Sequence, residues 1–282
     1  MTKEPRKKIT IADLMLMKQN QEKITMLTAY DYPLAVILDQ AEIDIILVGD
    51  SVGNVILGYD STVRVTMDEM VHHTKAVRKG TKYALLVADM PFMSFNVSKE
   101  QTIINAGRLI KEAEADAVKV EGGTPQVLDM IRALVGAGIP VMGHLGLTPQ
   151  TATMLSGFKV QGKNAQAAQE IIQQSQALEK AGCFSIVFEC IPDLVAKLIS
   201  QKLKIPTIGI GAGSATDGQV LVTHDMLGLY DRFKPKFVKQ YTKLAKKIST
   251  AVKEFVLEVQ TEKFPDKEHS FTINTEEFNK LK

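Results

Sequence analysis

Five ionisable residues close five successive apolar runs of the sequence: Asp50, Asp89, Glu121, His144 and Glu189. A carboxylate at the end of a buried strand must meet a cation, a proton or a metal ion, because burial disfavours its charged form. Each acid taken alone is better explained as a turn former or as the N-cap of the next helix. Taken together, the four acids and the histidine indicate one site in which carboxylates surround a cation.

The types of these side chains also limit the ion. Oxygen ligands without a cluster of cysteines or histidines point to a hard divalent ion, magnesium or manganese, rather than zinc. The tandem His72 and His73 fall in a segment expected to be helical, and they are only a weak indication of a metal ligand. Lys119 lies between two valines in the apolar run 116–123. A lysine whose only role was to contact solvent would be poorly placed there.

The elements that must position these residues alternate along the chain. Segments 99–115 and 165–182 have apolar residues at helical spacing, with Ser98 as an expected N-cap and Gly182 as an expected helix end. Such alternation predicts parallel strands, and eight repeats favour a closed (β/α)8 TIM barrel, an α/β fold whose active site lies where the strands end. The expected strands are the apolar runs 24–30, 44–50, 83–91, 116–123, 139–146, 183–190, 205–213 and 219–225.

Two segments lie outside this repeat. Residues 10–21 begin with a capping-box pattern, Thr10 to Asp13, and predict an extra N-terminal helix against one end of the barrel. Residues 234–260 predict a long C-terminal amphipathic helix, whose seven lysines indicate a solvated face because acids return at Glu254 and Glu258. No linker divides the chain, so a single domain over residues 1–282 is expected.

Composition narrows the classes of partner and compartment. The 282 residues are 45% hydrophobic and 23% charged with a net charge of +2, which predicts a globular protein with no nucleic acid and no membrane as partner. No secretory signal or run of about 20 apolar residues is visible.

Cys183 and Cys190 would lie about 23 Å apart on one strand, too far for a disulfide, so reduced thiols in the cytoplasm are expected. The glycine-rich segment 209–218 leaves two interpretations open, a phosphate site or a close approach of the backbone to a ligand.

Long motifs then carry a resemblance to a known family. The chain resembles the 3-methyl-2-oxobutanoate hydroxymethyltransferase family, whose members form ketopantoate (2-dehydropantoate) in pantothenate biosynthesis. The resemblance runs from about residue 10 to residue 271. The motifs that carry it are TAYDYPLA, LVGDSVGNVILGYDSTVRVTMDEMVHHTKAVRKG, DMPF, VKVEGG, GHLGLTPQ, GFKVQGK, FECIP and IGIGAGSATDGQVLVTHDMLG.

The resemblance implies a barrel of the phosphoenolpyruvate/pyruvate superfamily, a bound Mg²⁺ ion and 5,10-methylenetetrahydrofolate as co-substrate. It also implies a homo-oligomer, a decamer of two pentamers. The metal site would correspond to Asp50, Asp89 and Glu121, and Glu189 to the catalytic base. The keto-acid contacts would correspond to Asp50, Ser51, Asp89 and Lys119, whereas His144 is open between a substrate contact, assistance to the leaving folate nitrogen and support of its loop.

The implied reaction explains these residue types. The C3–H of 3-methyl-2-oxobutanoate is a very weak acid, so a carboxylate such as Glu189 needs a metal ion that stabilises the developing enolate. Three rivals stay open at this point. Lys119 can form a Schiff base in a metal-independent aldolase, the glycine-rich segment can serve a phosphoester-processing barrel, and the chain can be a scaffold without activity.

Overall fold

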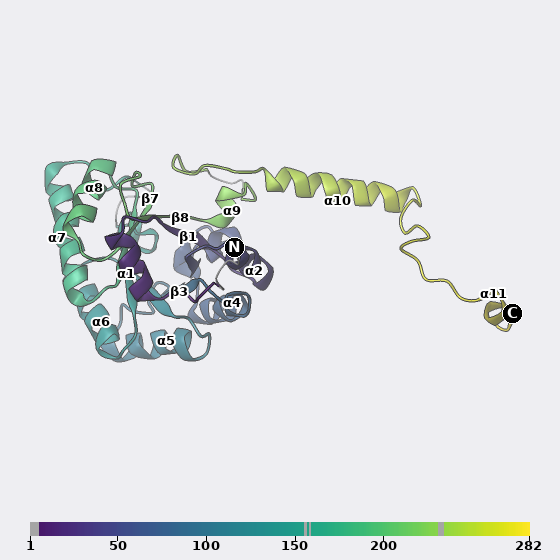
Figure 1. The fold of residues 1–282 in the computed structure, drawn as a ribbon, viewed down its shortest axis with the longest axis horizontal. Helices are drawn as coiled ribbons and strands as arrows, with labels where there is room; N and C mark the ends of the chain where they lie inside the picture. The colour runs from purple at the N-terminus through teal and green to yellow at the C-terminus, as the bar shows by residue number, and fades with distance from the viewer. Residues whose placement is uncertain (1–5, 155–156, 158, 231–233) are drawn as a thin grey trace, which may run out of the picture. The chain divides into compact units, whose positions relative to one another are not determined.

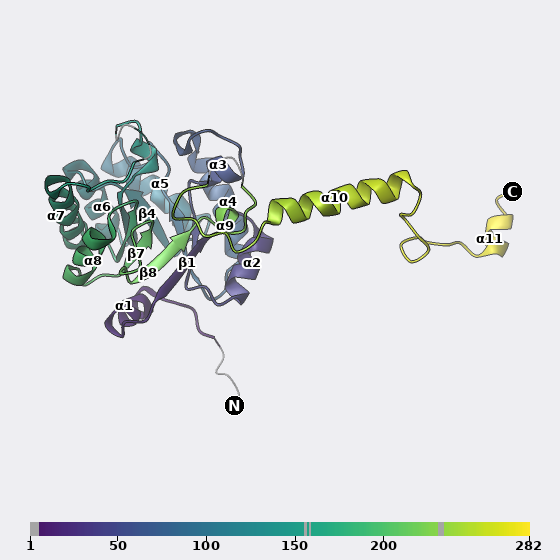
Figure 2. The ribbon, with the colours of Figure 1, turned by 90° about the horizontal axis from the view of Figure 1, so that it is seen from above.

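Eight parallel strands, paired in chain order from β1 to β8, close into a barrel (Figures 1 and 2). The structure, a computed structural model, describes residues 6–154, 157, 159–230 and 234–282. The predicted (β/α)8 barrel is therefore confirmed, with the eighth strand shorter than expected because Thr223–Met226 form the helix α9. The strands are β1 (Ile24–Thr28), β2 (Ile45–Val48), β3 (Leu85–Asp89), β4 (Ala117–Glu121), β5 (Val141–Gly146), β6 (Ser185–Glu189), β7 (Thr207–Ile210) and β8 (Gly218–Leu221).

Helices follow the first six strands and cover the outside of the barrel (Figure 2). The two predicted helices are present, and Ser98 Oγ accepts a hydrogen bond from the Gln101 N–H at 3.2 Å. Gly182 ends α7 with a φ of 101°, a left-handed conformation that favours glycine. The helices are α2 (Tyr32–Gln40), α3 (Val52–Val55), α4 (Met67–Gly80), α5 (Lys99–Lys111), α6 (Pro125–Gly136), α7 (Ala165–Ala181) and α8 (Asp193–Lys202), with short 3₁₀ turns η1 (Thr62–Arg64) and η2 (Pro149–Thr151).

The period of two along each strand separates an inner from an outer layer. In β4, Val118 and Val120 pack in the cluster beneath the helices, whereas Ala117 packs with the residues inside the barrel. Lys119 and Glu121 share the parity of Ala117, so their side chains point into the barrel. Both strand faces are therefore buried, which explains why the run reads as continuously apolar apart from these two residues.

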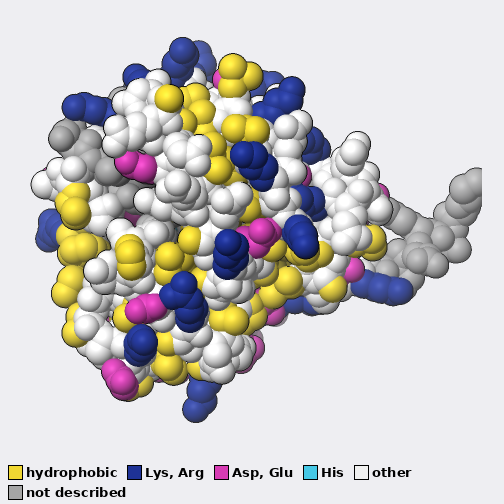
Figure 3. All heavy atoms as spheres, turned by 90° about the vertical axis from the view of Figure 1, so that its left-hand side faces the viewer, with side chains coloured by type: hydrophobic (Ala, Val, Ile, Leu, Met, Phe, Trp, Pro, Cys, Tyr) yellow, Lys and Arg dark blue, Asp and Glu magenta, His cyan; other side chains and the backbone are white. Residues whose placement is uncertain are grey.

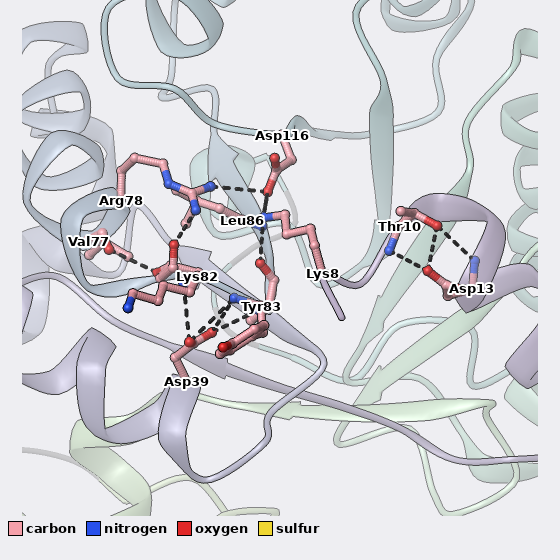
Figure 4. A network of polar contacts seen from close by, with 12 residues as sticks. Lys8, Thr10, Asp13, Asp39, Val77, Arg78, Lys82, Tyr83, Leu86 and Asp116 are labelled. Atoms are coloured by element: carbon pink, nitrogen blue, oxygen red, sulfur yellow. Dashed lines mark hydrogen bonds and ion pairs between the residues drawn. The ribbon is translucent and has the colours of Figure 1, made fainter. Parts of the chain in front are cut away.

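The helix α1 (Ile11–Gln19) closes the N-terminal end of the barrel, as predicted. Its capping box is formed, because the backbone N–H groups of Thr10 and Asp13 each bond the other residue's side chain (Figure 4). Leu14 is 1% exposed and packs in the inner cluster. Lys8 adds a second attachment, since its Nζ lies 2.6 Å from Asp116 Oδ2 and 2.8 Å from the Ala84 carbonyl oxygen (Figure 4).

Aspartates at this N-terminal end join strands in pairs. Each stands directly before an even-numbered strand and accepts a hydrogen bond from a backbone N–H at the start of the preceding odd-numbered strand. The bonds run from Thr25 to Asp44 at 2.8 Å, from Leu86 to Asp116 at 2.7 Å and from Thr207 to Asp217 at 2.8 Å. The polar side chains at the N-terminal end therefore serve the stability of the barrel, whereas active sites of such barrels lie at the C-terminal end.

Contacts within the chain define two units. The first extends to Thr223 and includes 235–238, and it holds the barrel; the second holds 224–234 and the chain from Lys239 onward. The expected single domain over 1–282 stays a prediction. On the face of the barrel that carries α7 and α8, lysines and arginines alternate with acidic side chains, in keeping with the small net charge (Figure 3).

The second unit contains α10 (Leu244–Gln260) and α11 (Thr275–Asn279). The expected helix over 234–260 was wrong in its start, because Pro235 lacks a backbone N–H and the segment before Leu244 is not helical. No residue of α10 is buried, and its exposed apolar side chains are Ile248, Val252, Phe255, Val256, Leu257 and Val259. Within the described parts of the chain, no helix is both long and apolar enough to cross a membrane.

Candidate active site at the carboxyl ends of the strands

The strand-end residues identified from the sequence lie together at the C-terminal end of the barrel. Asp89, Glu121 and Glu189 are the last residues of β3, β4 and β6, Asp50 follows β2 by two residues, and His144 lies in β5. The register places Glu121 opposite His144 on the neighbouring strand. All are buried except Glu189, which is half-buried.

Lys119 is the cation of this cluster. It is 4% exposed, and its Nζ lies 2.8 Å from Asp89 Oδ1. Asp89 and Lys119 are direct partners in the register of β3 and β4, so the backbone itself brings the two charges together. The second oxygen of Asp89, Oδ2, accepts the backbone N–H of Asp50 at 3.0 Å. Asp89 is thus held from two sides by neighbouring strand ends.

His144 connects the cluster to Glu189. Its Nδ1 lies 3.3 Å from Glu121 Oε1 and 3.4 Å from Lys119 Nζ, and its Nε2 lies 3.4 Å from Glu189 Oε2. The ring therefore stands between Glu121, which the family resemblance assigns to the metal site, and Glu189, which it assigns as the base. A protonated ring can donate to both of them.

Burial sets the protonation of the two aspartates. Desolvation raises the pKa of Asp50 to about 8, helped by the charges of Glu121 and Asp89 and opposed by Lys119. Desolvation also raises the pKa of Asp89, against the attraction of Lys119. Full ionisation of the acids therefore requires more positive charge than Lys119 supplies.

The remaining groups favour their charged forms. Burial alone would raise the pKa of Glu121, but the neighbouring His144 and Lys119 outweigh it, and the pKa is lowered. Burial and Lys119 oppose the charge of His144, yet Glu121 and Glu189 raise its pKa to about 9. Desolvation of Lys119 is likewise outweighed, chiefly by Asp89, and its pKa lies above its ordinary value. An ammonium with this raised pKa is a poor nucleophile for an imine.

The donor set for a metal ion consists of the buried carboxylates. Among the residues that the structure describes, no three His, Cys, Asp or Glu side chains are already arranged to hold an ion. The chemistry of the donors nevertheless fits a hard divalent cation, because Asp50, Asp89 and Glu121 are buried, all oxygen, and close enough to shift one another's pKa. A divalent ion would remove the repulsion that Lys119 leaves uncompensated.

Two neighbours of the cluster carry no strong signal in the sequence. Tyr30, 1% exposed, lies two residues beyond β1 and packs in the cluster beneath the helices; its hydroxyl is 2.7 Å from Ser51 Oγ and orients that hydroxyl, which follows Asp50 in the chain. Gln150, 4% exposed, lies in η2 and bonds Asp50 and Glu121. The parity of β1 does not extend to Tyr30, since Ala29 and Tyr30 pack in the same outer cluster, and a neutral amide after a strand gave no sign of Gln150.

Other sequence features lie outside the cluster. His72 and His73 are in α4, and His73 Nδ1 contacts the Tyr30 carbonyl oxygen at 2.7 Å.

Gly213, with a φ of 77°, approaches Asp193 of α8 so closely that a Cβ would meet the Asp193 Cβ at 2.5 Å. Gly213 therefore allows a close approach to α8, whereas the phosphate site and the approach to a ligand both stay predictions for this segment. Cys183 and Cys190 are free, as predicted, and burial raises the pKa of each thiol to about 12.

Solved structures of other proteins have a similar barrel. The chain superimposes on phosphonopyruvate hydrolase in complex with oxalate and Mg²⁺ with a TM-score of 0.59 and 14% identity, covering 97% of this chain and 94% of that one. It superimposes on 2,3-dimethylmalate lyase, a member of the PEP mutase/isocitrate lyase superfamily, with a TM-score of 0.58 and 15% identity, covering 92% and 91%. These solved structures share the (β/α)8 barrel of this chain, as expected.

Sequence similarity is much closer to one group of enzymes. The chain is 57% identical over 270 residues to 3-methyl-2-oxobutanoate hydroxymethyltransferase of Heliobacterium modesticaldum, covering 96% of this chain and 98% of the relative. It is 56% identical over 266 residues to the enzyme of that name from Moorella thermoacetica, covering 94% and 98%. Residues 8–267 match the family described as ketopantoate hydroxymethyltransferase. The chain belongs to the ketopantoate hydroxymethyltransferase family.

Proposed function

We propose that this chain transfers a hydroxymethyl group from 5,10-methylenetetrahydrofolate to 3-methyl-2-oxobutanoate, which gives ketopantoate for pantothenate biosynthesis. The observation that carries the proposal is the buried cluster of Asp50, Asp89, Glu121, Lys119 and His144, in a chain of this family. Such a cluster suits an anionic keto acid whose carbon must lose a proton.

The proposed cofactor is Mg²⁺, held by Asp50, Asp89 and Glu121. The raised pKa of Asp50 supports this, because a buried carboxylate that resists ionisation is stabilised by a cation beside it. The similar barrel of phosphonopyruvate hydrolase, solved with oxalate and Mg²⁺, supports it as well. When bound, the ion supplies Lewis-acid polarisation of the keto oxygen.

The proposed roles of the side chains follow from their positions. Lys119 contributes positive charge to the pocket of an anionic substrate, and Ser51, whose Oγ is oriented by Tyr30, provides a hydroxyl beside it. Glu189 accepts the C3 proton, because it is the half-buried carboxylate at the edge of the cluster and carries no ion pair to Lys119 in the structure. His144, 3.4 Å from Glu189, holds the orientation of that carboxylate.

The carbon atom that has lost its proton then attacks the methylene carbon of the folate, and a C–C bond forms. The methylene carbon is bonded to two folate nitrogens, so both C–N bonds break over the whole transfer, and a water molecule supplies the hydroxyl oxygen. Of the C3 proton and the two protons of the water, one stays on the new hydroxyl group and two end on the folate nitrogens. His144 is one of two groups at hand for the departing nitrogen, because its raised pKa keeps a proton on the ring at neutral pH. The protonated Glu189 is the other group, after it has taken the C3 proton.

One assay tests the function directly. Purified protein with 3-methyl-2-oxobutanoate and 5,10-methylenetetrahydrofolate should form ketopantoate, lose the activity in EDTA and regain it with Mg²⁺ or Mn²⁺. Full activity in EDTA, with substrate trapped on Lys119 by borohydride, would replace this proposal by the imine mechanism. Absence of product under every condition would refute the transferase function.

Two further properties are also proposed, an assembly and a location. The exposed apolar side chains of α10 support a homo-oligomer, for which the decamer is the proposed assembly, because apolar surface of this extent is stabilised by packing against a second copy. Free thiols and a small net charge support a cytoplasmic location with no nucleic acid or membrane as partner.

A further inference from the structure

Gln150 contacts groups from three strand ends. It lies in η2, directly after β5, and only 4% of its surface is exposed. Its backbone N–H donates to Glu121 Oε2 at 3.1 Å. Its side-chain Nε2 donates to Asp50 Oδ2 and to the Met90 carbonyl oxygen, each at 3.0 Å. Because Met90 follows Asp89, one residue links all three positions of the proposed metal site.

The orientation of the Gln150 amide is fixed by these partners. Exchanging its oxygen and nitrogen would point an oxygen at the Met90 carbonyl oxygen, which can only accept hydrogen bonds. Both Nε2 hydrogens are therefore in use, one of them on Asp50. A donor at Asp50 Oδ2 favours the ionised form of that carboxylate and holds its plane in one direction.

The same orientation leaves Oε1 of Gln150 buried without a hydrogen-bond partner among the described residues. A buried amide kept only for stability would be expected to satisfy both of its ends, because an unsatisfied buried acceptor costs free energy. This cost is explained if Gln150 serves to place Nε2 against Asp50. Oε1 would then accept a hydrogen bond from a bound ligand or a water molecule.

We propose that Gln150 is a positioning residue, which holds Asp50 through its side chain and Glu121 through its backbone in the arrangement that binds the divalent cation and the keto acid. This inference rests on the proposed magnesium site. Gln150 acts through the two carboxylates and takes no proton itself. It should therefore govern the affinity for the ion more than the rate once the ion is bound.

The test compares three variants by a readout independent of catalysis. Gln150→Met keeps the length of the side chain but removes both donors, and Gln150→Asn keeps the amide but is one methylene too short to reach Asp50. Gln219→Met is the matched control, because Gln219 also donates twice through Nε2, to Gly213 O and Thr216 Oγ1, away from the cluster. Electron paramagnetic resonance of free Mn²⁺ gives the Kd of each protein, and thermal unfolding reports the fold.

Both Gln150 variants should bind Mn²⁺ about 10–100-fold more weakly than the wild type, the usual effect of losing a partner of a metal ligand. Their KM for the keto acid should rise, and saturating Mn²⁺ should restore most of kcat. Gln219→Met should bind Mn²⁺ like the wild type. If Gln150→Met does not fold, the Mn²⁺ affinity of Gln150→Asn tests the inference.

Two results would overturn the inference in different ways. A folded Gln150 variant with a Mn²⁺ Kd within twofold of the wild type would leave the magnesium site intact and remove the positioning role. A wild-type protein that does not bind Mn²⁺ would remove the proposed metal site, and this inference with it.

Discussion

Replacing Asp50 by asparagine should remove a pH dependence from the stability of the metal-free protein. Burial raises the pKa of Asp50 to about 8 in the folded state, against an ordinary value of 3.8. Between these pH values the folded protein holds a proton that the unfolded chain has released. The free energy of unfolding therefore falls as the pH rises from about 4 to about 8, and asparagine cannot contribute to this fall because it does not ionise.

The size of the effect follows from the shift. Each pKa unit corresponds to about 1.4 kcal/mol, so from about pH 4 to pH 7 the wild type should lose about 4 kcal/mol more than Asp50→Asn. The charges of Asp89 and Glu121 act on Asp50, so the measured titration belongs to the three carboxylates together. A divalent cation should shrink the difference, because it stabilises the ionised carboxylate.

Urea unfolding in EDTA at several pH values, followed by circular dichroism, measures this difference. Asp129→Asn is the matched control, because Asp129 is 52% exposed and pairs with Arg132 on the helix surface. The control should follow the wild type at every pH. Equal pH slopes for the wild type and Asp50→Asn would refute the argument that Asp50 is desolvated beside two other acids.

Glu189→Gln should keep the fold and slow exchange of the C3 proton of 3-methyl-2-oxobutanoate with deuterium oxide by about 10²–10⁴-fold, measured by proton NMR; exchange at the wild-type rate would assign the proton to another group. Gly146→Ala should lower both kcat and Tm, because a Cβ there would collide with the Glu189 carbonyl oxygen, whereas Gly136→Ala meets nothing within 4 Å and should leave both unchanged. Asp116→Asn should lower the free energy of unfolding by about 1–3 kcal/mol in urea at an unchanged kcat, since it weakens bonds at the far end of the barrel. Light scattering should give a mass several times 31.0 kDa, and a monodisperse monomer would contradict the proposed homo-oligomer.

The barrel could be predicted because its signal repeats along the chain. Eight apolar runs separated by helical segments leave few other arrangements, and strand parity then directs Lys119 and Glu121 inward. The acids at the strand ends were found for the same reason, since parallel strands bring their carboxyl ends to one edge. Their proposed roles came from the family resemblance and stay to be tested.

The contacts of single side chains could not be predicted in the same way. Gln150 is a neutral residue on a short turn, and its links to Asp50 and Glu121 depend on the path of η2, which no periodicity encodes. The start of the C-terminal helix was missed because Phe237 and Tyr241 keep helical spacing although the chain there is not helical. Spacing alone cannot detect that a proline and the packing of neighbouring residues have displaced the first turns.

The aspartates that join odd to even strands bear on how the barrel can be cut and rebuilt. Asp44, Asp116 and Asp217 fasten β1 to β2, β3 to β4 and β7 to β8 at the N-terminal end of the barrel. Asp39 of α2 joins the first two of these pairs, because its carboxylate accepts the backbone N–H groups of Tyr83 and Ala84 just before β3. New chain ends after α4 would separate Asp39 from these partners in the chain, and new ends between β3 and β4 would separate Asp116 from Leu86. For circular permutation or for exchange with another barrel, the unit that keeps these bonds within one continuous segment is therefore β1 to β4 with their helices.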